Sequence, residues 1–229
     1  EYVFIISEIG HNWNGDLDIA KDMITASRDH GASAAKIQLY DIDTIKRPGD
    51  TNYDELKAAQ LTKGQMYQLL EHADNVGIEL FASVFSLDRL QWLLESGMKR
   101  VKLGQRSYQN TTLMRAVEAV RLPLIVSCPN DYIPLTWKTS KAAPDILWCM
   151  SRREILLQGI QKFPKKFNKK GYNGFSCHCI GLDYCKEALD KGATVIEKHF
   201  TFNQNWSGWD QPSSMTPDEL EELVKYANG

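Results

Sequence analysis

Residues 193–201 read Ala-Thr-Val-Ile-Glu-Lys-His-Phe-Thr, and they give the clearest indication of the fold. Thr194, Val195 and Ile196 favour an extended, packed strand, because β-branched side chains fit a pleated surface. The strand then runs into an acid, a base and an imidazole, side chains that are seldom buried without partners. A strand whose carboxyl end turns polar is typical of a (βα)8 barrel enzyme, since the active site of this fold lies at the carboxyl ends of the strands.

A second strand ends in the same way. Residues 174–179 read Gly-Phe-Ser-Cys-His-Cys and place His178 at a strand end that neighbours the one carrying His199. Neutral imidazole is the commonest nitrogen ligand for a divalent metal, so the two histidines are a candidate metal pair. On spacing alone, two ordinary buried histidines are an equal alternative. Cys177 and Cys179 raise zinc as a rival metal, but strand alternation turns them away from His178, so we expect buried thiols.

The rest of the chain alternates between strand and helix patterns. This argues for parallel βαβ units that close into one (βα)8 TIM barrel spanning residues 1–229. The polar stretch 41–60 is expected to be a long loop over the active site, and residues 129–144 show only a weak helical pattern. Strands are expected at residues 3–7, 34–39, 79–84, 101–103, 124–127, 146–150, 174–177 and 194–199, and helices around residues 19–26, 66–73, 87–94, 113–120, 155–163, 184–189 and 217–226.

Length and composition exclude several classes of protein. A chain of 229 residues suits one barrel, and an apolar content of 43% is ample for a core. The net charge of −2 shows no basic excess, which argues against a nucleic-acid-binding protein. No apolar run approaches the roughly 20 residues of a membrane span, and no signal peptide is visible. The five cysteines, an odd number, are expected to be reduced thiols of a cytoplasmic protein.

The chain resembles the sialic acid (N-acetylneuraminate) synthase family. The family's Gly-Tyr-Ser-Asp-His-Thr and Ile-Glu-Lys-His-Phe-Thr segments are matched by residues 174–179 and 196–201. Its opening Glu-Ile-Gly, with Asn-Gly a few residues on, is matched by residues 8–15, and its second strand by residues 35–38. The resemblance implies a metal-dependent condensation of phosphoenolpyruvate with a small aldehyde sugar, which gives a sialic-acid-like 3-deoxy-ulosonic acid and phosphate.

The resemblance also implies which residues bind the metal and phosphoenolpyruvate. His178 and His199 would hold a divalent metal, manganese first, with magnesium, cobalt or zinc as alternatives. Lys36 and Lys102 would bind the phosphate and carboxylate of phosphoenolpyruvate. A buried ammonium group needs such an anionic partner, because its burial without one is costly. Taken singly, a strand-end serine needs no such role. The family's hydroxyl contacts to phosphoenolpyruvate are matched by Ser83, Ser127 and Ser176.

Two carboxylates and three polar residues complete the expected site. Glu8 ends the first strand, and Glu197 shares a strand face with the second histidine, where a carboxylate can orient a ligand or transfer a proton. The resemblance implies that Gln38 and Asp210 contact the acceptor sugar and that Ser151 binds substrate. An ion pair with a barrel lysine is the alternative for Glu8, and a solvated loop position is the alternative for Asp210.

The chain departs from the family pattern at two positions, one that the resemblance links to proton transfer and one that it links to acceptor binding. Ser107 stands where the family has an acid, and Arg153 stands where it has a tyrosine that contacts the acceptor. Arg106, Arg152 and Arg153 either bring positive charge to the mouth of the barrel, which would suit a more acidic acceptor, or are surface charges.

Three functional hypotheses follow from these observations. The first is the condensing synthase. The second is an inactive homologue that keeps an anion-binding pocket, and the third is a metal-dependent lyase or isomerase acting on small sugars; fold alone does not separate them. The family's C-terminal antifreeze-like β domain is not expected within residues 1–229. The sequence leaves open whether the protein forms a homodimer.

Overall fold

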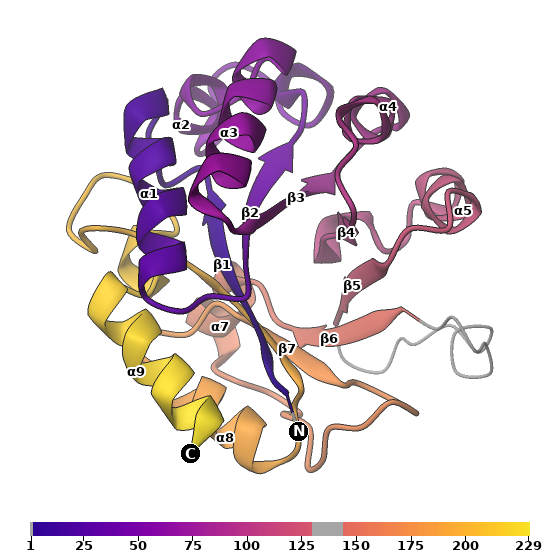
Figure 1. Ribbon diagram of the computed structural model, residues 1–229. Coiled ribbons are helices and arrows are strands. Elements are labelled where there is room, and N and C mark those ends of the chain that lie inside the picture. Colours follow the sequence, from indigo (N-terminus) through magenta and orange to yellow (C-terminus); the bar gives the residue numbers. More distant parts are fainter. Residues whose placement is uncertain (1, 130–143) are drawn as a thin grey trace.

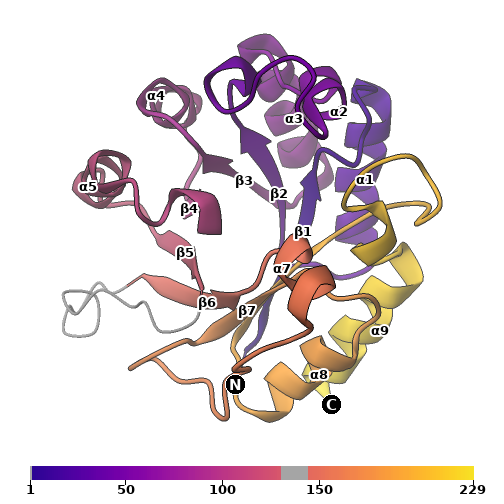
Figure 2. The same ribbon diagram turned by 180° about the vertical axis from the view of Figure 1, so that it is seen from behind.

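The computed structural model describes residues 2–129 and 144–229, in which eight parallel strands close into a barrel (Figure 1; seen from behind in Figure 2). Each strand pairs with the next one in the chain, and the last returns to pair with the first. The expected TIM barrel is confirmed. The strands are β1 (Phe4–Gly10), β2 (Ala34–Leu39), β3 (Glu79–Val84), β4 (Val101–Leu103), β5 (Leu124–Cys128), β6 (Asp145–Cys149), β7 (Gly174–Cys177) and β8 (Val195–His199).

Helices surround the strands on the outside of the barrel (Figure 1). In most of them buried residues recur at helical spacing, as with Ala20, Met23 and Ile24 in α1 or Leu220 and Leu223 in α9, so these helices pack one apolar stripe against the strands. The short helices α2 and α7 have no buried residue. The helices are α1 (Leu17–Asp29), α2 (Tyr53–Ala58), α3 (Lys63–Val76), α4 (Leu87–Ser96), α5 (Thr111–Ala119), α7 (Arg152–Gln158), α8 (Asp183–Asp190) and α9 (Pro217–Asn228), with 3-10 turns η1 (Ile42–Thr44), η2 (Gln105–Ser107) and η3 (Gln211–Ser213).

The barrel interior has an apolar layer and, nearer the carboxyl ends of the strands, a polar layer. Side chains alternate along a strand, so a residue two positions after an inward-facing one faces inward again, one layer higher. The apolar layer is a buried cluster of Ile6, Ala34, Phe81, Ile125, Leu147 and Val195. Two positions further along these strands stand Glu8, Lys36, Ser83, Ser127, Cys149 and Glu197. The apolar layer therefore forms the base on which a polar cavity floor is built.

Several expected boundaries differ from the structure, and three of these differences concern segments near the cavity. The stretch 41–60 is not an unstructured loop, because it contains η1 and α2. The helix expected at residues 155–163 is α7 and begins earlier, since Ser151 and Glu154 form a capping box at its start. The first strand continues to Gly10, whose φ of +55° ends the extended conformation. Most of the weakly helical stretch 129–144 lies outside the described residues.

The cysteines are free and buried, as expected. Cys177 and Cys179 lie beside Lys198, whose Nζ is 3.6 Å from Cys177 Sγ and donates to the Cys179 carbonyl at 2.6 Å. In the described part of the chain, no three or more His, Cys, Asp or Glu residues are grouped as a ready metal site. No helix in residues 2–129 and 144–229 combines the length and the apolar character needed to cross a membrane.

Candidate active site

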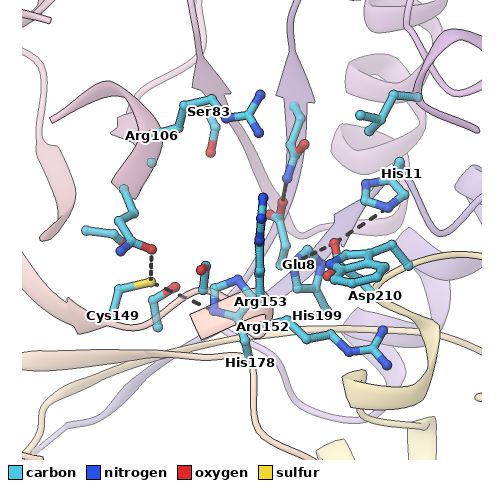
Figure 3. Close-up of a pocket in the computed structure, with 18 of the residues that line it drawn as sticks. Glu8, His11, Ser83, Arg106, Cys149, Arg152, Arg153, His178, His199 and Asp210 are labelled. Atoms are coloured by element: carbon cyan, nitrogen blue, oxygen red, sulfur yellow. Dashed lines mark hydrogen bonds and ion pairs between the residues drawn. The ribbon is translucent and has the colours of Figure 1, made fainter. Parts of the chain in front are cut away.

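A cavity of about 740 Å³ opens at the carboxyl ends of the barrel strands (Figure 3). Its lining comes from the strand ends, from η1 and α2 within residues 41–60, and from the start of α7. The structure brings every predicted site residue into this one cavity. These residues are Glu8, Lys36, Gln38, Ser83, Lys102, Ser127, Ser151, Ser176, His178, Glu197, His199 and Asp210.

Two carboxylates and two lysines form the floor of the cavity. Lys102 Nζ donates to both oxygens of Glu197, at 2.7 and 2.8 Å. Lys36 Nζ pairs with Glu8 and lies 3.7 Å from Glu197 Oε2. All four side chains are buried. Because the two positive charges meet two negative ones, the burial of each charge is compensated. The alternative expected for Glu8, an ion pair with a barrel lysine, is therefore present.

Neutral polar groups surround these ion pairs. Ser176 Oγ donates to Glu197 Oε1 at 2.8 Å, and Lys36 Nζ donates to Ser83 Oγ at 2.7 Å. Gln38 Nε2 donates to Glu8 Oε1 at 2.7 Å. Ser127 Oγ is buried and has no hydrogen-bond partner among the described residues. A buried hydroxyl without a partner costs stability, which is typical of a group that waits for a ligand.

The floor charges shift one another's protonation. Burial alone would raise the pKa of Glu197, but Lys102 and Lys36 hold it well below the usual carboxyl range. Burial raises the pKa of Glu8, and the neighbouring Lys36 only partly offsets this effect. The two floor carboxylates thus have opposite tendencies: Glu197 stays ionised, whereas Glu8 accepts a proton more readily than an ordinary glutamate.

A cluster of histidines lies beside this floor (Figure 3). The ring centroids of His178 and His199 are 5.3 Å apart, and those of His11 and His199 are 6.4 Å apart. Asp210 Oδ2 lies 3.5 Å from Nε2 of His11 and 3.5 Å from Nε2 of His199. Asp210 is therefore a buried partner of two imidazoles, and the solvated loop position weighed for it is wrong. His11 Nε2 also pairs with Glu55 at 2.8 Å.

The two histidines expected to bind metal differ in protonation. Burial lowers the pKa of His199 to about 3, so its ring is neutral, the form that can ligate a metal. Burial also acts to lower the pKa of His178, but Cys149 and Asp210 raise it to about 9. Cys149 Sγ lies 3.8 Å from Nδ1 of His178.

The geometry around His199 fits a divalent metal. Two ligand atoms that each lie about 2.1 Å from one ion at a roughly tetrahedral angle are about 3.4 Å apart. The 3.5 Å between His199 Nε2 and Asp210 Oδ2 matches this spacing. Nδ1 of His199 is buried without a hydrogen-bond partner in the described part of the chain. His199 and Asp210 are thus spaced to share one ion, with its other positions open to water and substrate, and His178 lies beside them.

Of the residues that depart from the family pattern, the three arginines line the cavity and Ser107 does not. Arg106, Arg152 and Arg153 line the cavity, so they are not charges on a remote surface. Ser107 is buried and is not part of the cavity lining among the described residues. Ser151 lines the cavity, but its hydroxyl donates to Glu154 at 2.7 Å and caps α7.

Sequence reasoning missed several residues of the site. His11 lies in the quoted segment 8–15, and its position directly after the first strand was the available signal. Glu55 comes from α2, within a stretch that shows no clear periodicity. Cys149 is two positions beyond the inward-facing Leu147, so strand alternation could have placed it in the cavity.

Comparison with known proteins adds an independent line of evidence. The sequence model of the NeuB family matches residues 23–133 and 146–228. The N,N'-diacetyllegionaminic acid synthase of Legionella pneumophila is 31% identical over 97% of this chain and 70% of its own length. The N-acetylneuraminate-9-phosphate synthase of Homo sapiens is 28% identical over 97% of this chain and 68% of its own length.

Solved structures agree with this grouping. The N-acetylneuraminic acid (sialic acid) synthetase of Leptospira borgpetersenii superposes with a TM-score of 0.82 at 28% identity, covering 100% of this chain and 83% of the other. A truncated 3-deoxy-D-arabino-heptulosonate 7-phosphate synthase of Thermotoga maritima has a TM-score of 0.67 at 15% identity and covers 98% of this chain and 84% of its own. At that identity, the second likeness concerns the fold alone.

Proposed function

Because the chain belongs to the NeuB family, we propose that it is a synthase that condenses phosphoenolpyruvate with an aldehyde sugar. The products would be a 3-deoxy-ulosonic acid and phosphate. The observation that carries this proposal is the placement of the buried Lys36 and Lys102 in the same cavity as His178 and His199. An anion site and an aldehyde site within one cavity of about 740 Å³ are what this condensation requires.

The floor of the cavity would hold phosphoenolpyruvate. Lys36 and Lys102 would donate charge-assisted hydrogen bonds to its phosphate and carboxylate, and the unpartnered hydroxyl of Ser127 would add another. In the structure, Glu8 and Glu197 form ion pairs with these two lysines. Their pairing keeps the ammonium groups charged and fixed in place before the ligand arrives.

His178 and His199 would hold a divalent metal, with manganese as the first choice. When bound, the metal would act as a Lewis acid on the aldehyde oxygen of the acceptor. Asp210, which lies 3.5 Å from His199, and Gln38, which lines the same cavity, would orient the acceptor hydroxyl groups. This would set the aldehyde carbon facing C3 of phosphoenolpyruvate.

The proposed condensation forms one C–C bond and breaks the C2–O bond between phosphoenolpyruvate and its phosphate. C3 of phosphoenolpyruvate attacks the aldehyde carbon, and the aldehyde oxygen gains a proton to become a hydroxyl. Water adds at C2 and loses a proton, and the C2–O bond to phosphate breaks. Burial raises the pKa of Glu8, which suits a group that takes up and returns a proton, whereas Glu197 stays ionised.

One observation favours a second function, an anion-binding homologue without turnover. The acid of the family pattern is absent at Ser107, and this serine is buried outside the lining of the cavity. Such a protein would bind phosphoenolpyruvate through the same lysines but would release no phosphate.

An assay of phosphate release separates the two functions. The protein is incubated with phosphoenolpyruvate, Mn²⁺ and a panel of aldoses. The synthase releases phosphate only when both substrates are present, and Lys102→Met abolishes the release. Lys225→Met, in the exposed last turn of α9, is the matched control and keeps full activity. Tight phosphoenolpyruvate binding without release by any aldose would favour the binding protein.

A further inference from the structure

The mouth of the cavity carries positive charge that the proposed chemistry does not use. Arg106 follows β4, whereas Arg152 and Arg153 begin α7 after β6, so the positive charge comes from two walls of the cavity (Figure 3). No carboxylate lies within 4.0 Å of their guanidinium groups in the described ranges 2–129 and 144–229. Other arginines behave differently: Arg100 pairs with Glu79 at 3.0 Å and Arg89 pairs with Asp88.

The position of the α7 pair is not explained by helix stability. Arg152 and Arg153 occupy the first turn of α7, directly after its N-cap Ser151. Positive charges are favourable at the carboxyl end of a helix and unfavourable at its amino end. A local rule that is broken without a structural gain is typical of a functional position. Here the gain would come from a ligand in the cavity that both side chains line.

Contacts of Arg152 place this charge on the acceptor side of the cavity. Its guanidinium lies 5.1 Å from the ring centroid of Trp209, which is a favourable cation–π distance and fixes the side chain. Trp209 directly precedes Asp210, the partner of His199. Lys36 and Lys102 are meanwhile paired at the floor, where phosphoenolpyruvate would lie.

We infer that the acceptor sugar carries an anionic group, a phosphate or a carboxylate, away from its aldehyde, and that Arg106, Arg152 and Arg153 receive this group at the cavity mouth. The inference rests on the proposed function and names its acceptor class. A planar guanidinium matches the geometry of either anion with two parallel hydrogen bonds. The arginine that replaces the family's tyrosine at position 153 therefore changes both the shape and the charge that the acceptor meets.

The test compares three acceptors at fixed phosphoenolpyruvate and Mn²⁺: N-acetylmannosamine, its 6-phosphate and the corresponding uronic acid. The wild-type protein should prefer one anionic sugar to the neutral one by at least ~10-fold in kcat/KM, the size of one charge-assisted contact. The anionic sugar with the higher kcat/KM identifies whether the acceptor carries a phosphate or a carboxylate. In Arg152→Gln and Arg153→Gln this preference should shrink toward one, while Arg115→Gln, on the exposed face of α5, keeps it. Arg153→Lys should keep part of the preference, since lysine retains the positive charge but cannot donate two parallel hydrogen bonds to the anion.

Two results would overturn the inference: a wild-type preference for the neutral sugar, or a rise in the KM for phosphoenolpyruvate that is equal for every acceptor in the arginine variants. The latter would assign the arginines to phosphoenolpyruvate. A calorimetric titration keeps this test separate from the proposed function. If no acceptor turns over, direct binding of the sugar phosphate or uronic acid, weakened by Arg153→Gln, still supports the arginine site, and absence of binding contradicts it.

Discussion

Among single residues, the buried ion pairs of the cavity floor and the imidazoles beside them decide the proposed chemistry. Glu197 is central, because it accepts hydrogen bonds from Lys102 and Ser176 and lies 3.7 Å from Lys36. Its two-residue spacing from His199 predicts that both side chains face the cavity, and both line it. By contrast, no periodicity marks His11 or Glu55, since they follow a strand end and sit in a short helix.

The first residue-scale prediction concerns the metal. His178→Ala and His199→Ala should each abolish stoichiometric Mn²⁺ binding, because these two imidazoles are the proposed nitrogen ligands of the ion. Metal content after dialysis, measured by mass spectrometry, checks this, and circular dichroism shows whether the barrel is intact. His72→Ala is the matched control, since His72 bonds Thr25 on the outer helices. Full metal content in the double variant would end the assignment.

The second residue-scale prediction concerns the anion. Lys36→Ala and Lys102→Ala should each weaken phosphoenolpyruvate binding by roughly 1.5–3 kcal/mol, the range for a hydrogen bond to a charged group. Calorimetric titration measures the loss. Because either change leaves a buried carboxylate with fewer partners, the variants should also unfold more easily. Unchanged affinity in both would indicate that phosphoenolpyruvate binds elsewhere or not at all.

At the scale of the elements, the sequence predicted strands better than loops. The buried strand cores were recognisable because β-branched and apolar runs recur between helical stripes, and β2, β3, β4 and β7 have the expected bounds. The helix α2 was missed because it is short and has no buried residue that would produce a periodic apolar pattern. The start of α7 was placed too late, since its capping box precedes the apolar residues.

The element-scale prediction concerns the packing of β7 in the sheet. A Cβ on Gly174 would lie 2.4 Å from Leu147 Cδ2 and 2.5 Å from the Val195 carbonyl, so strands β6 and β8 leave no space for it. Gly174→Ala should lower the free energy of unfolding by ~1–3 kcal/mol or more through overpacking. Gly64→Ala, in open space within α3, should be neutral or slightly stabilising. Urea denaturation compares the two variants. Equal stability of both variants would contradict the close packing of β7 against β6 and β8 at Gly174.

At the scale of the whole molecule, the fold follows from the alternating pattern, but the cavity does not. The pattern fixes which strand residues face inward, and so the floor residues could be named from sequence. The cavity wall depends on how residues 41–60 and α7 fold over the strand ends, and the contact of Arg152 in α7 with Trp209 joins distant parts of the chain. Such contacts have no local sequence signal.

The whole-molecule prediction concerns the cysteines. All five are buried and free, and burial raises the pKa of Cys128 to about 12, which keeps it as an unreactive thiol at neutral pH. Ellman's reagent should therefore label less than one thiol in the native protein and five after denaturation without reductant. Fewer than five in the denatured chain would reveal a disulfide and contradict the reduced state.

The oxygen-18 content of the released phosphate, for a reaction run in water enriched with oxygen-18, tests the synthase assignment directly. The proposed condensation breaks the C2–O bond of phosphoenolpyruvate, so the phosphate should leave without oxygen from water. The reaction is run with Mn²⁺ and an accepted aldose, and phosphorus NMR reads the isotope content of the released phosphate. Unlabelled phosphate whose release requires the aldose is the predicted result. Labelled phosphate, or release that does not depend on the aldose, would contradict the synthase assignment.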